Sequence, residues 1–279
     1  MSRFQPDREL LRAEQKGQYF EKVKALEVYL ATVAEQLRSE GVPADASLRV
    51  NMEAFSDVYR PAEIARDNVI VESWQREYHP DISPESRQGE ELKTDGTQLE
   101  MLKSAILHKQ LQDKFIICRT SLYDDIKNGV DNIIIDRASG RPVCALDEVG
   151  DINGTVLEKK KEIVLKKNFN KDTQGSSLRY GLWMEDTKGN RTIKKGKISH
   201  IPTFYLSLPR DYIRKGIELF NCFGDPSEHE KKLFAYFLAT LYEQVHRIEL
   251  DTAFDRMPDE FCQAEQSFKK ALATISGIR

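Results

Sequence analysis

The stretch NGVDNIIIDRASGRPVCALDEVGD, residues 128–151, decides the fold because it contains two short apolar runs around a tight turn. The runs VDNIII (130–135) and RPVCALDEV (141–149) are rich in β-branched residues, as β-strands are. Ala138-Ser139-Gly140 between them suits a short hairpin turn. The predicted hairpin carries Asp131 at one end and Asp147-Glu148 at the other, where apolar residues are expected.

These acids are unusual because of the faces that they share. Side chains alternate along a strand, so Asp131 lies on one face with Ile133 and Ile135. In the second strand Asp147 lies with the apolar residues Val143, Ala145 and Val149, while Glu148 lies on the opposite face. An unpaired carboxylate on an apolar face is costly.

Such acids are usually paired with a base, hydrogen-bonded or bound to a metal. Two carboxylates from neighbouring strands offer the oxygen ligands that Mg²⁺ or Mn²⁺ prefers, so Asp131 and Asp147, with Glu148 close by, form a candidate metal site. The structural alternative has Asp131 capping a strand entry and the acidic pair forming the polar end of a strand before Gly150.

The rest of the chain predicts an α/β fold. Helices are expected at 7–40, 61–78 and 90–112, and KFIICRT (114–120) is a further strand. We expect a central mixed β-sheet in an α-β-β-α-β-β order, with helical N- and C-terminal additions. Further predicted elements are a helix at 155–167, strands at 177–193 and 199–209, and helices at 211–220, 228–250 and 259–275.

The element order also divides the chain into three parts. We expect a helical N-terminal region at 1–89, which ends in a linker rich in Pro and Ser (79–89). An α/β core follows at 90–222, and C-terminal helices at 223–279 pack on that core.

The middle of the chain, about 120 residues, resembles the PD-(D/E)xK superfamily of restriction-endonuclease-like nucleases. The likeness rests on GVD opening a strand, a hairpin, and an acidic pair at the end of the next strand. It implies a nuclease fold in which Asp131 is the first metal ligand and Asp147 the second, with Glu148 taking that role if the register is shifted by one. It also implies an acid on the first helix, for which Glu100 is the candidate.

This chain departs from the family pattern at the lysine, which should stand two residues after the second acid. That position is Val149, or Gly150 in the shifted register. Some family members supply the lysine from the following helix, and by that likeness Lys160 or Lys161 of EKKKE (158–162) would take the catalytic role. An ammonium there would orient the attacking water and offset charge on the phosphorane.

Charge is unevenly distributed along the chain. Residues 157–215 contain fifteen Lys/Arg and six Asp/Glu, although the whole chain has a net charge of −3. A basic segment in an acidic protein is either a polyanion-binding surface or a set of solvated lysines. In the first case DNA is the partner, and the candidate phosphate contacts are Arg119, Lys159, Lys166, Lys167, Lys194, Lys195 and Lys197.

Residues just before the hairpin admit two interpretations. Ser121, Asp124 and Asp125 could contact substrate or support a metal. Alternatively, Ser121 caps a one-turn helix and an Arg–Asp pair lies at the surface.

Several classes of protein are disfavoured. The chain has no long apolar run, and its charged first twenty residues lack the apolar core of a secretory signal, so no membrane partner is expected. Four scattered cysteines favour reduced thiols in a cytoplasmic protein. Phosphate-binding glycine loops, zinc spacings and the GxSxG elbow are absent from the sequence.

These observations favour a metal-dependent nuclease that hydrolyses phosphodiester bonds in DNA with Mg²⁺ or Mn²⁺. Two alternatives stay open: a catalytically inactive nuclease-like module that binds nucleic acid, and a helical interaction protein without a nucleic-acid role. The oligomeric state is also open, with a homodimer among the possibilities.

Overall fold

The computed structural model describes residues 8–78, 92, 94–149, 155–170, 174–187, 189–251 and 254–276. Within them lie the α-helices α1 (Arg8–Ser39), α2 (Pro61–Tyr78), α4 (Asp95–Leu111), α5 (Leu122–Asn128), α6 (Thr155–Phe169), α7 (Arg210–Glu218), α8 (Glu228–Leu250) and α9 (Asp259–Ser276). The strands are β1 (Phe115–Arg119), β2 (Asn132–Asp136), β3 (Pro142–Val149), β4 (Ser176–Thr187), β5 (Asn190–Ile201) and β6 (Thr203–Ser207). The short 3₁₀ helices Met52–Phe55 and Phe254–Arg256 complete the described elements.

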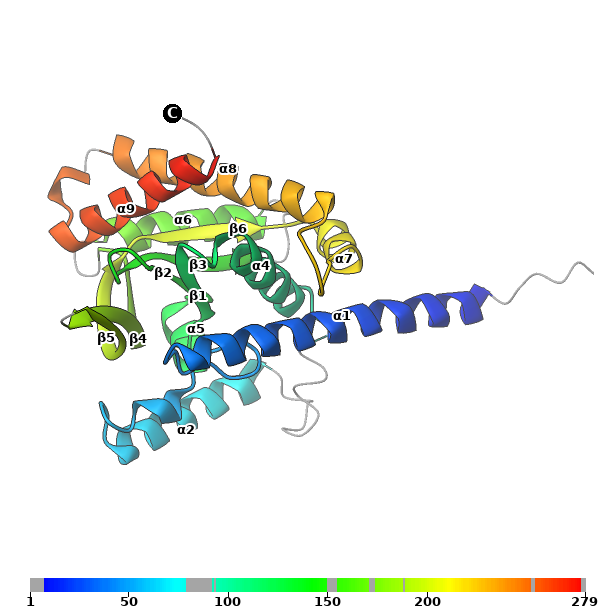
Figure 1. Cartoon of the computed structure of the whole chain (residues 1–279), viewed down its shortest axis with the longest axis horizontal. Coiled ribbons are helices and arrows are strands. Elements are labelled where there is room, and N and C mark those ends of the chain that lie inside the picture. Colours follow the sequence, from blue (N-terminus) through cyan, green and yellow to red (C-terminus); the bar gives the residue numbers. More distant parts are fainter. Residues whose placement is uncertain are drawn as a thin grey trace, which may run out of the picture.

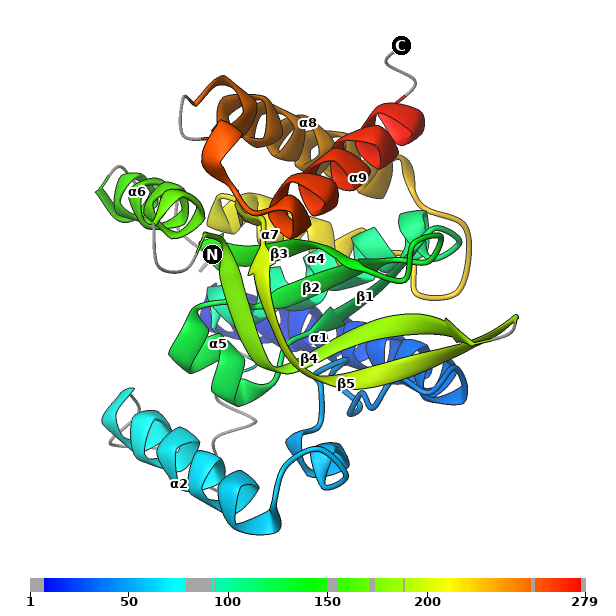
Figure 2. The same cartoon turned by 90° about the vertical axis from the view of Figure 1, so that its left-hand side faces the viewer.

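The expected mixed α/β class is confirmed (Figure 1). A four-stranded sheet has the order β1-β2-β3-β6, in which β1, β2 and β3 are antiparallel neighbours and β6 is parallel to β3. Strands β4 and β5 form a separate antiparallel ribbon, visible below the sheet in Figure 2.

The predicted α-β-β-α-β-β order is not confirmed. Three strands lie between α4 and α6, and two of the later strands belong to the ribbon rather than to the central sheet. Local patterns identify strands but leave their partners open, because pairing is decided by contacts between segments far apart in sequence. Pro202 lies between β5 and β6, at the point where the chain leaves the ribbon and enters the edge of the sheet.

Helices surround the sheet and bury its apolar residues. Helix α4 packs against β1 and β3, while α6 contacts β6 and β3, α8 contacts β6, and α9 contacts β3. Helix α1 lies against α4 and α7, and one cluster of buried apolar side chains runs from Val23 of α1 to Leu272 of α9. None of the described helices is long and apolar enough to cross a membrane.

The hairpin turn requires glycine at its tip. Gly140 has φ of +75°, and a Cβ there would lie 2.4 Å from the main-chain oxygen of Met184 in β4. The close approach of the ribbon therefore requires glycine at this turn. The position of the turn sets the residue at which β3 begins. The predicted linker at 79–89 lies outside the described residues.

Candidate metal centre and its surroundings

The backbone brings Asp131 to the sheet through a short helix. Ser121 caps α5 by accepting a hydrogen bond from the Asp124 amide, as the helix-capping interpretation predicted. Gly129 ends α5 in the left-handed conformation, with φ of 56°. Two residues later Asp131 donates its amide hydrogen to the Leu146 carbonyl at 2.8 Å, which places it at the entry to β2 beside β3.

Three carboxylates meet at this point. Oxygen atoms of Glu100, Asp131 and Glu148 all lie within 4.8 Å of one another. They come from α4, from the residue before β2, and from β3, so three successive parts of the core each supply one acid. The Glu148 amide also donates to Asp131 Oδ2 at 2.6 Å, which fixes the orientation of that carboxylate.

Lys103 lies beside this acidic triad of Glu100, Asp131 and Glu148. Its side chain is fully buried, forms an ion pair with Glu148, and donates to Asn132 Oδ1 at 2.6 Å. Asn132 in turn donates to Ser104 Oγ at 2.9 Å. The ammonium is therefore held on both sides, by a carboxylate and by an amide.

Burial and charge shift the acid–base properties of the cluster. Burial, together with the Asp125, Glu100 and Asp147 carboxylates, raises the pKa of Asp131 well above its ordinary value. Burial lowers the pKa of Lys103 to about 8, partly opposed by Asp131 and Glu100. The cluster thus holds more buried negative charge than Lys103 neutralises.

The donor set fits a divalent cation. Three carboxylates provide hard oxygen ligands at a spacing that one ion can bridge, and Mg²⁺ and Mn²⁺ prefer such ligands. Burial is the main cause of the raised pKa of Asp131, and a bound cation would oppose that rise.

The four predicted acids do not all lie at the same place in the structure. Glu100, Asp131 and Glu148 come together, whereas Asp147 forms an ion pair with Lys160 of α6. Burial raises the pKa of Asp147, and Lys160 and Lys167 partly offset the rise. Adjacent strand residues point to opposite faces, so Glu148 reaches the Lys103 of α4 and Asp147 reaches α6.

The predicted lysines and arginine divide into several groups. Lys161 pairs with Glu158 and Lys166 with Glu162 along the surface of α6, and Lys159 is exposed. Lys167 donates to the carbonyls of Asn128 and Gly129, next to the chain that carries Asp131. In the ribbon, Lys194 pairs with Glu185, Lys195 pairs with Asp57, and Lys197 is exposed.

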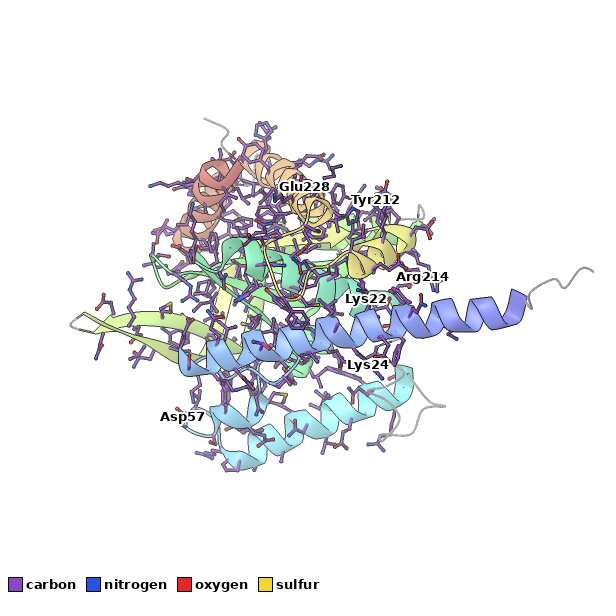
Figure 3. All side chains as sticks on the ribbon, turned by 45° about the vertical axis from the view of Figure 1, so that its right-hand side comes forward. Lys22, Lys24, Asp57, Tyr212, Arg214 and Glu228 are labelled. Carbon is purple, nitrogen blue, oxygen red and sulfur yellow. The ribbon has the colours of Figure 1, made fainter. Side chains whose placement is uncertain are left out.

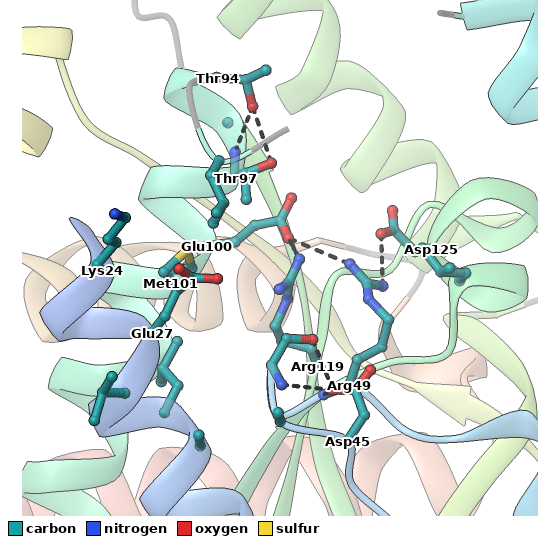
Figure 4. A pocket seen from close by; sticks show the side chains of 18 of the residues that line it. Lys24, Glu27, Asp45, Arg49, Thr94, Thr97, Glu100, Met101, Arg119 and Asp125 are labelled. Atoms are coloured by element: carbon teal, nitrogen blue, oxygen red, sulfur yellow. Dashed lines mark hydrogen bonds and ion pairs between the residues drawn. The ribbon is translucent and has the colours of Figure 1, made fainter. Parts of the chain in front are cut away.

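Arg119 is buried at the end of β1 and contacts Glu100. A second arginine, Arg49, lies 3.6 Å from the same carboxylate (Figure 4). Neither Arg49 nor Lys103 was among the predicted site residues. A signal for Lys103 does exist, because it stands one helical turn after Glu100 on the stripe of α4 that holds Leu99, Ile106 and Leu107. A lysine on a buried stripe needs a partner, and that requirement points to the acids.

The chain has no match among protein-family models, curated proteins or solved structures.

Proposed function

We propose that this chain is a divergent PD-(D/E)xK nuclease that hydrolyses phosphodiester bonds in DNA with a divalent metal ion. The observation that carries the proposal is the convergence of Glu100, Asp131 and Glu148 within 4.8 Å, with the ammonium of Lys103 against Glu148. The order of the three acids along the chain is the order in the family that the hairpin resembles: first helix, strand entry, next strand.

Glu100, Asp131 and Glu148 would hold the metal ion. When bound, Mg²⁺ or Mn²⁺ polarises a phosphate oxygen and lowers the pKa of a bound water. The protein's own contribution is to keep the ligands fixed, since the Glu148 amide orients Asp131 and Arg119 contacts Glu100.

Lys103 takes the part of the missing family lysine in this proposal. Val149, two residues after Asp147, is apolar and buried, and Gly150 lies outside the described residues. An ammonium arriving from α4 rather than from β3 can still orient the attacking water and offset charge on the phosphorane.

A second candidate function has one observation in its favour. Glu148 is paired with Lys103 and Glu100 with Arg119, so these two acids have cationic partners within the protein itself. A nuclease-like module that binds nucleic acid without cutting it would have this arrangement if the cations permanently replaced the metal. It predicts salt-sensitive DNA binding without metal binding.

Cleavage of plasmid and branched DNA with Mg²⁺, and with EDTA as the blank, tests the proposal. We expect Asp131→Asn and Glu148→Gln to lose about a thousandfold in rate, a loss similar to that of a main electrostatic contributor in other enzymes. Glu243→Gln, at an exposed acid of α8, serves as the control. Equal cleavage by all four proteins would contradict the assignment.

Calorimetric titration with Mn²⁺ separates the two candidates. A nuclease binds the ion, and Asp131→Asn abolishes the heat of binding. The non-catalytic module gives no heat with either protein but still retains DNA at low salt.

A further inference from the structure

A cavity of about 1070 Å³ opens beside the acidic triad. Its lining comes from α1, the segment after α1, α4, the end of β1 and α5. Glu100 belongs both to the triad and to the cavity lining, so the cavity adjoins the candidate metal centre at this residue. Figure 4 shows Glu100 at the cavity together with Arg49 and Arg119.

Two buried arginines line this cavity. Arg49 and Arg119 are 8% and 6% exposed, and Arg119 Nε has no hydrogen-bond partner although the atom is buried. The chain at Arg49 forms a parallel bridge with Arg119, and the Arg119 amide donates to the Leu48 carbonyl at 2.9 Å. The segment after α1 thus extends the edge of β1 and brings its arginine to the mouth of the site.

The backbone that presents Arg49 is strained. Leu48, directly before it, has φ of +63°, which is rare for a leucine. Asp45 holds the turn by accepting hydrogen bonds from the amides of Ser47 and Arg49 through Oδ1. Strain of this kind is kept where the surroundings over-determine the position and is concentrated at functional sites.

The remaining wall of the cavity is largely apolar. Met101 of α4, Leu122 and Ile126 of α5, and Val28 and Ala31 of α1 belong to the lining, as do the acids Glu27 and Asp45. Guanidinium groups beside an apolar wall match a nucleotide, with the arginines on phosphate oxygens and the wall on the base and sugar. The cavity volume is at the upper end of small-molecule sites, which is ample for one nucleotide.

We propose that this cavity binds one unpaired nucleotide of a DNA strand, with its phosphate on Arg49 and Arg119, next to the acidic triad. The bases of an intact duplex are stacked and paired, so only a single strand or an extruded nucleotide can enter such a cavity. The inference rests on the proposed function and deepens it: the substrate is DNA with unpaired nucleotides, rather than fully paired DNA.

The charges around the cavity define what the phosphate must displace. Arg49 Nη1 lies 2.9 Å from Asp125 Oδ2, and Arg119 contacts Glu100. The phosphate therefore competes with Asp125 for Arg49. Asp125→Asn should remove the nearest carboxylate charge from this guanidinium, which keeps its contacts with Glu100 and the Thr120 carbonyl, and should tighten phosphate binding several-fold.

Lys24 lines the cavity and pairs with Glu21, whereas Lys22 lies on the opposite side of α1, toward Arg214 of α7 (Figure 3).

Binding of fluorescent oligonucleotides in Ca²⁺ tests the inference, because this ion takes oxygen ligands and a binding assay needs no turnover. The probes are a single strand, a duplex of the same sequence with one unpaired nucleotide, and the fully paired duplex. We expect the single strand and the interrupted duplex to bind at least about tenfold more tightly than the paired duplex, and Arg49→Ala to lose about tenfold, as expected for a charge-assisted hydrogen bond.

Gly96→Phe provides a variant that leaves the buried arginines intact. Gly96 lines the cavity in the first turn of α4, and a Cβ there meets nothing within 4 Å, so a phenyl ring can occupy part of the cavity without a clash at the backbone. Gly17→Phe, at an exposed glycine of α1 with equal space, is the matched control. We expect the first variant to lose single-strand binding and the second to keep it.

Equal binding of single strand and paired duplex, or full binding by Gly96→Phe, would overturn the inference. In either case metal-dependent cleavage of paired DNA would leave the proposed function intact. If instead the single strand binds as expected and no DNA is cut with Mg²⁺, the nuclease proposal fails and the nucleotide cavity stands.

Discussion

Two neighbouring acids of β3 lie on opposite faces of the sheet and have different cationic partners. Glu148 meets a fully buried lysine and two further carboxylates, whereas Asp147 meets Lys160, whose side chain is 25% exposed. Both carboxylates are buried, but the lysine that faces Glu148 is fully buried, so water screens that ion pair less. The acidic residues alone do not distinguish these environments; the helix that covers each face does.

Glu148→Gln and Asp147→Asn test this comparison with the largest expected effect. The first substitution removes a proposed metal ligand and should lower the rate of Mg²⁺-dependent DNA cleavage about a thousandfold, while the second should cost less than about tenfold. Rates on one plasmid substrate at saturating Mg²⁺ provide the measurement. A larger loss for Asp147→Asn would move the metal centre to the α6 face.

Lys103→Met and Lys160→Met compare the two lysines through stability. Removal of the Lys103 charge leaves Glu148 buried without its cation, so we expect the free energy of unfolding to fall by about 3–5 kcal/mol. Removal of Lys160 should cost less, because Lys167 also offsets the charge of the buried Asp147.

Urea denaturation of both variants, with and without Mg²⁺, gives these values. Because a bound cation compensates Glu148, Mg²⁺ should restore most of the stability of Lys103→Met and little of that of Lys160→Met. Equal losses in the two variants would mean that the two faces do not differ.

Asp131 should make the stability of the folded protein depend on pH. Its pKa is raised well above the ordinary value of 3.8 in the folded protein. At a pH between 3.8 and the pKa of the folded protein, the folded state therefore binds more protons than the unfolded state. The stability that comes from protonated Asp131 is therefore present at low pH and is lost as pH rises, by at most about 1.4 kcal/mol per pH unit.

Asp131→Asn should remove this loss, because an amide stays neutral and still accepts the Glu148 amide hydrogen. Melting temperatures of both proteins, without metal, across the acidic to neutral range measure the effect as a difference. Parallel curves would contradict a buried, electrostatically strained Asp131.

The sequence predicted much of this centre, and what it missed has a physical cause. Asp131, Glu148 and Glu100 were named as candidates from alternation along strands and from the family resemblance, because those signals are local, and the structure brings their carboxylates together. The choice between Asp147 and Glu148 depends on which face of β3 meets α4, and strand alternation is the same for both. An irregularity in the pairing of β2 with β3, between Ile134 and Ile135, further blurs the register.

Lys103 and Arg49 were missed for a different reason. A lysine or arginine is exposed by default, so burial of either is visible only when distant segments are brought together. The same holds for the ribbon of β4 and β5, whose position beside β3 depends on contacts between distant segments. The sequence identifies residues that can act as acids, bases or metal ligands. It does not identify the neighbours that shift their pKa, because those neighbours are brought close only by the tertiary structure.

The smallest expected effect concerns DNA binding on the α6 side. Lys166 is 80% exposed at its side chain and has only a long ion pair with Glu162, whereas Lys195 is held by Asp57 and the Ala54 carbonyl. If DNA extends from the acidic triad across α6, Lys166→Ala should weaken binding to all sequences. The slope of log affinity against log salt concentration should then fall by about one counterion. Lys195→Ala should leave that slope unchanged, since its charge is already neutralised by Asp57.

Anisotropy titrations over a series of salt concentrations measure the slope for both variants. An unchanged slope for Lys166→Ala would confine the DNA to the α4 side of the sheet.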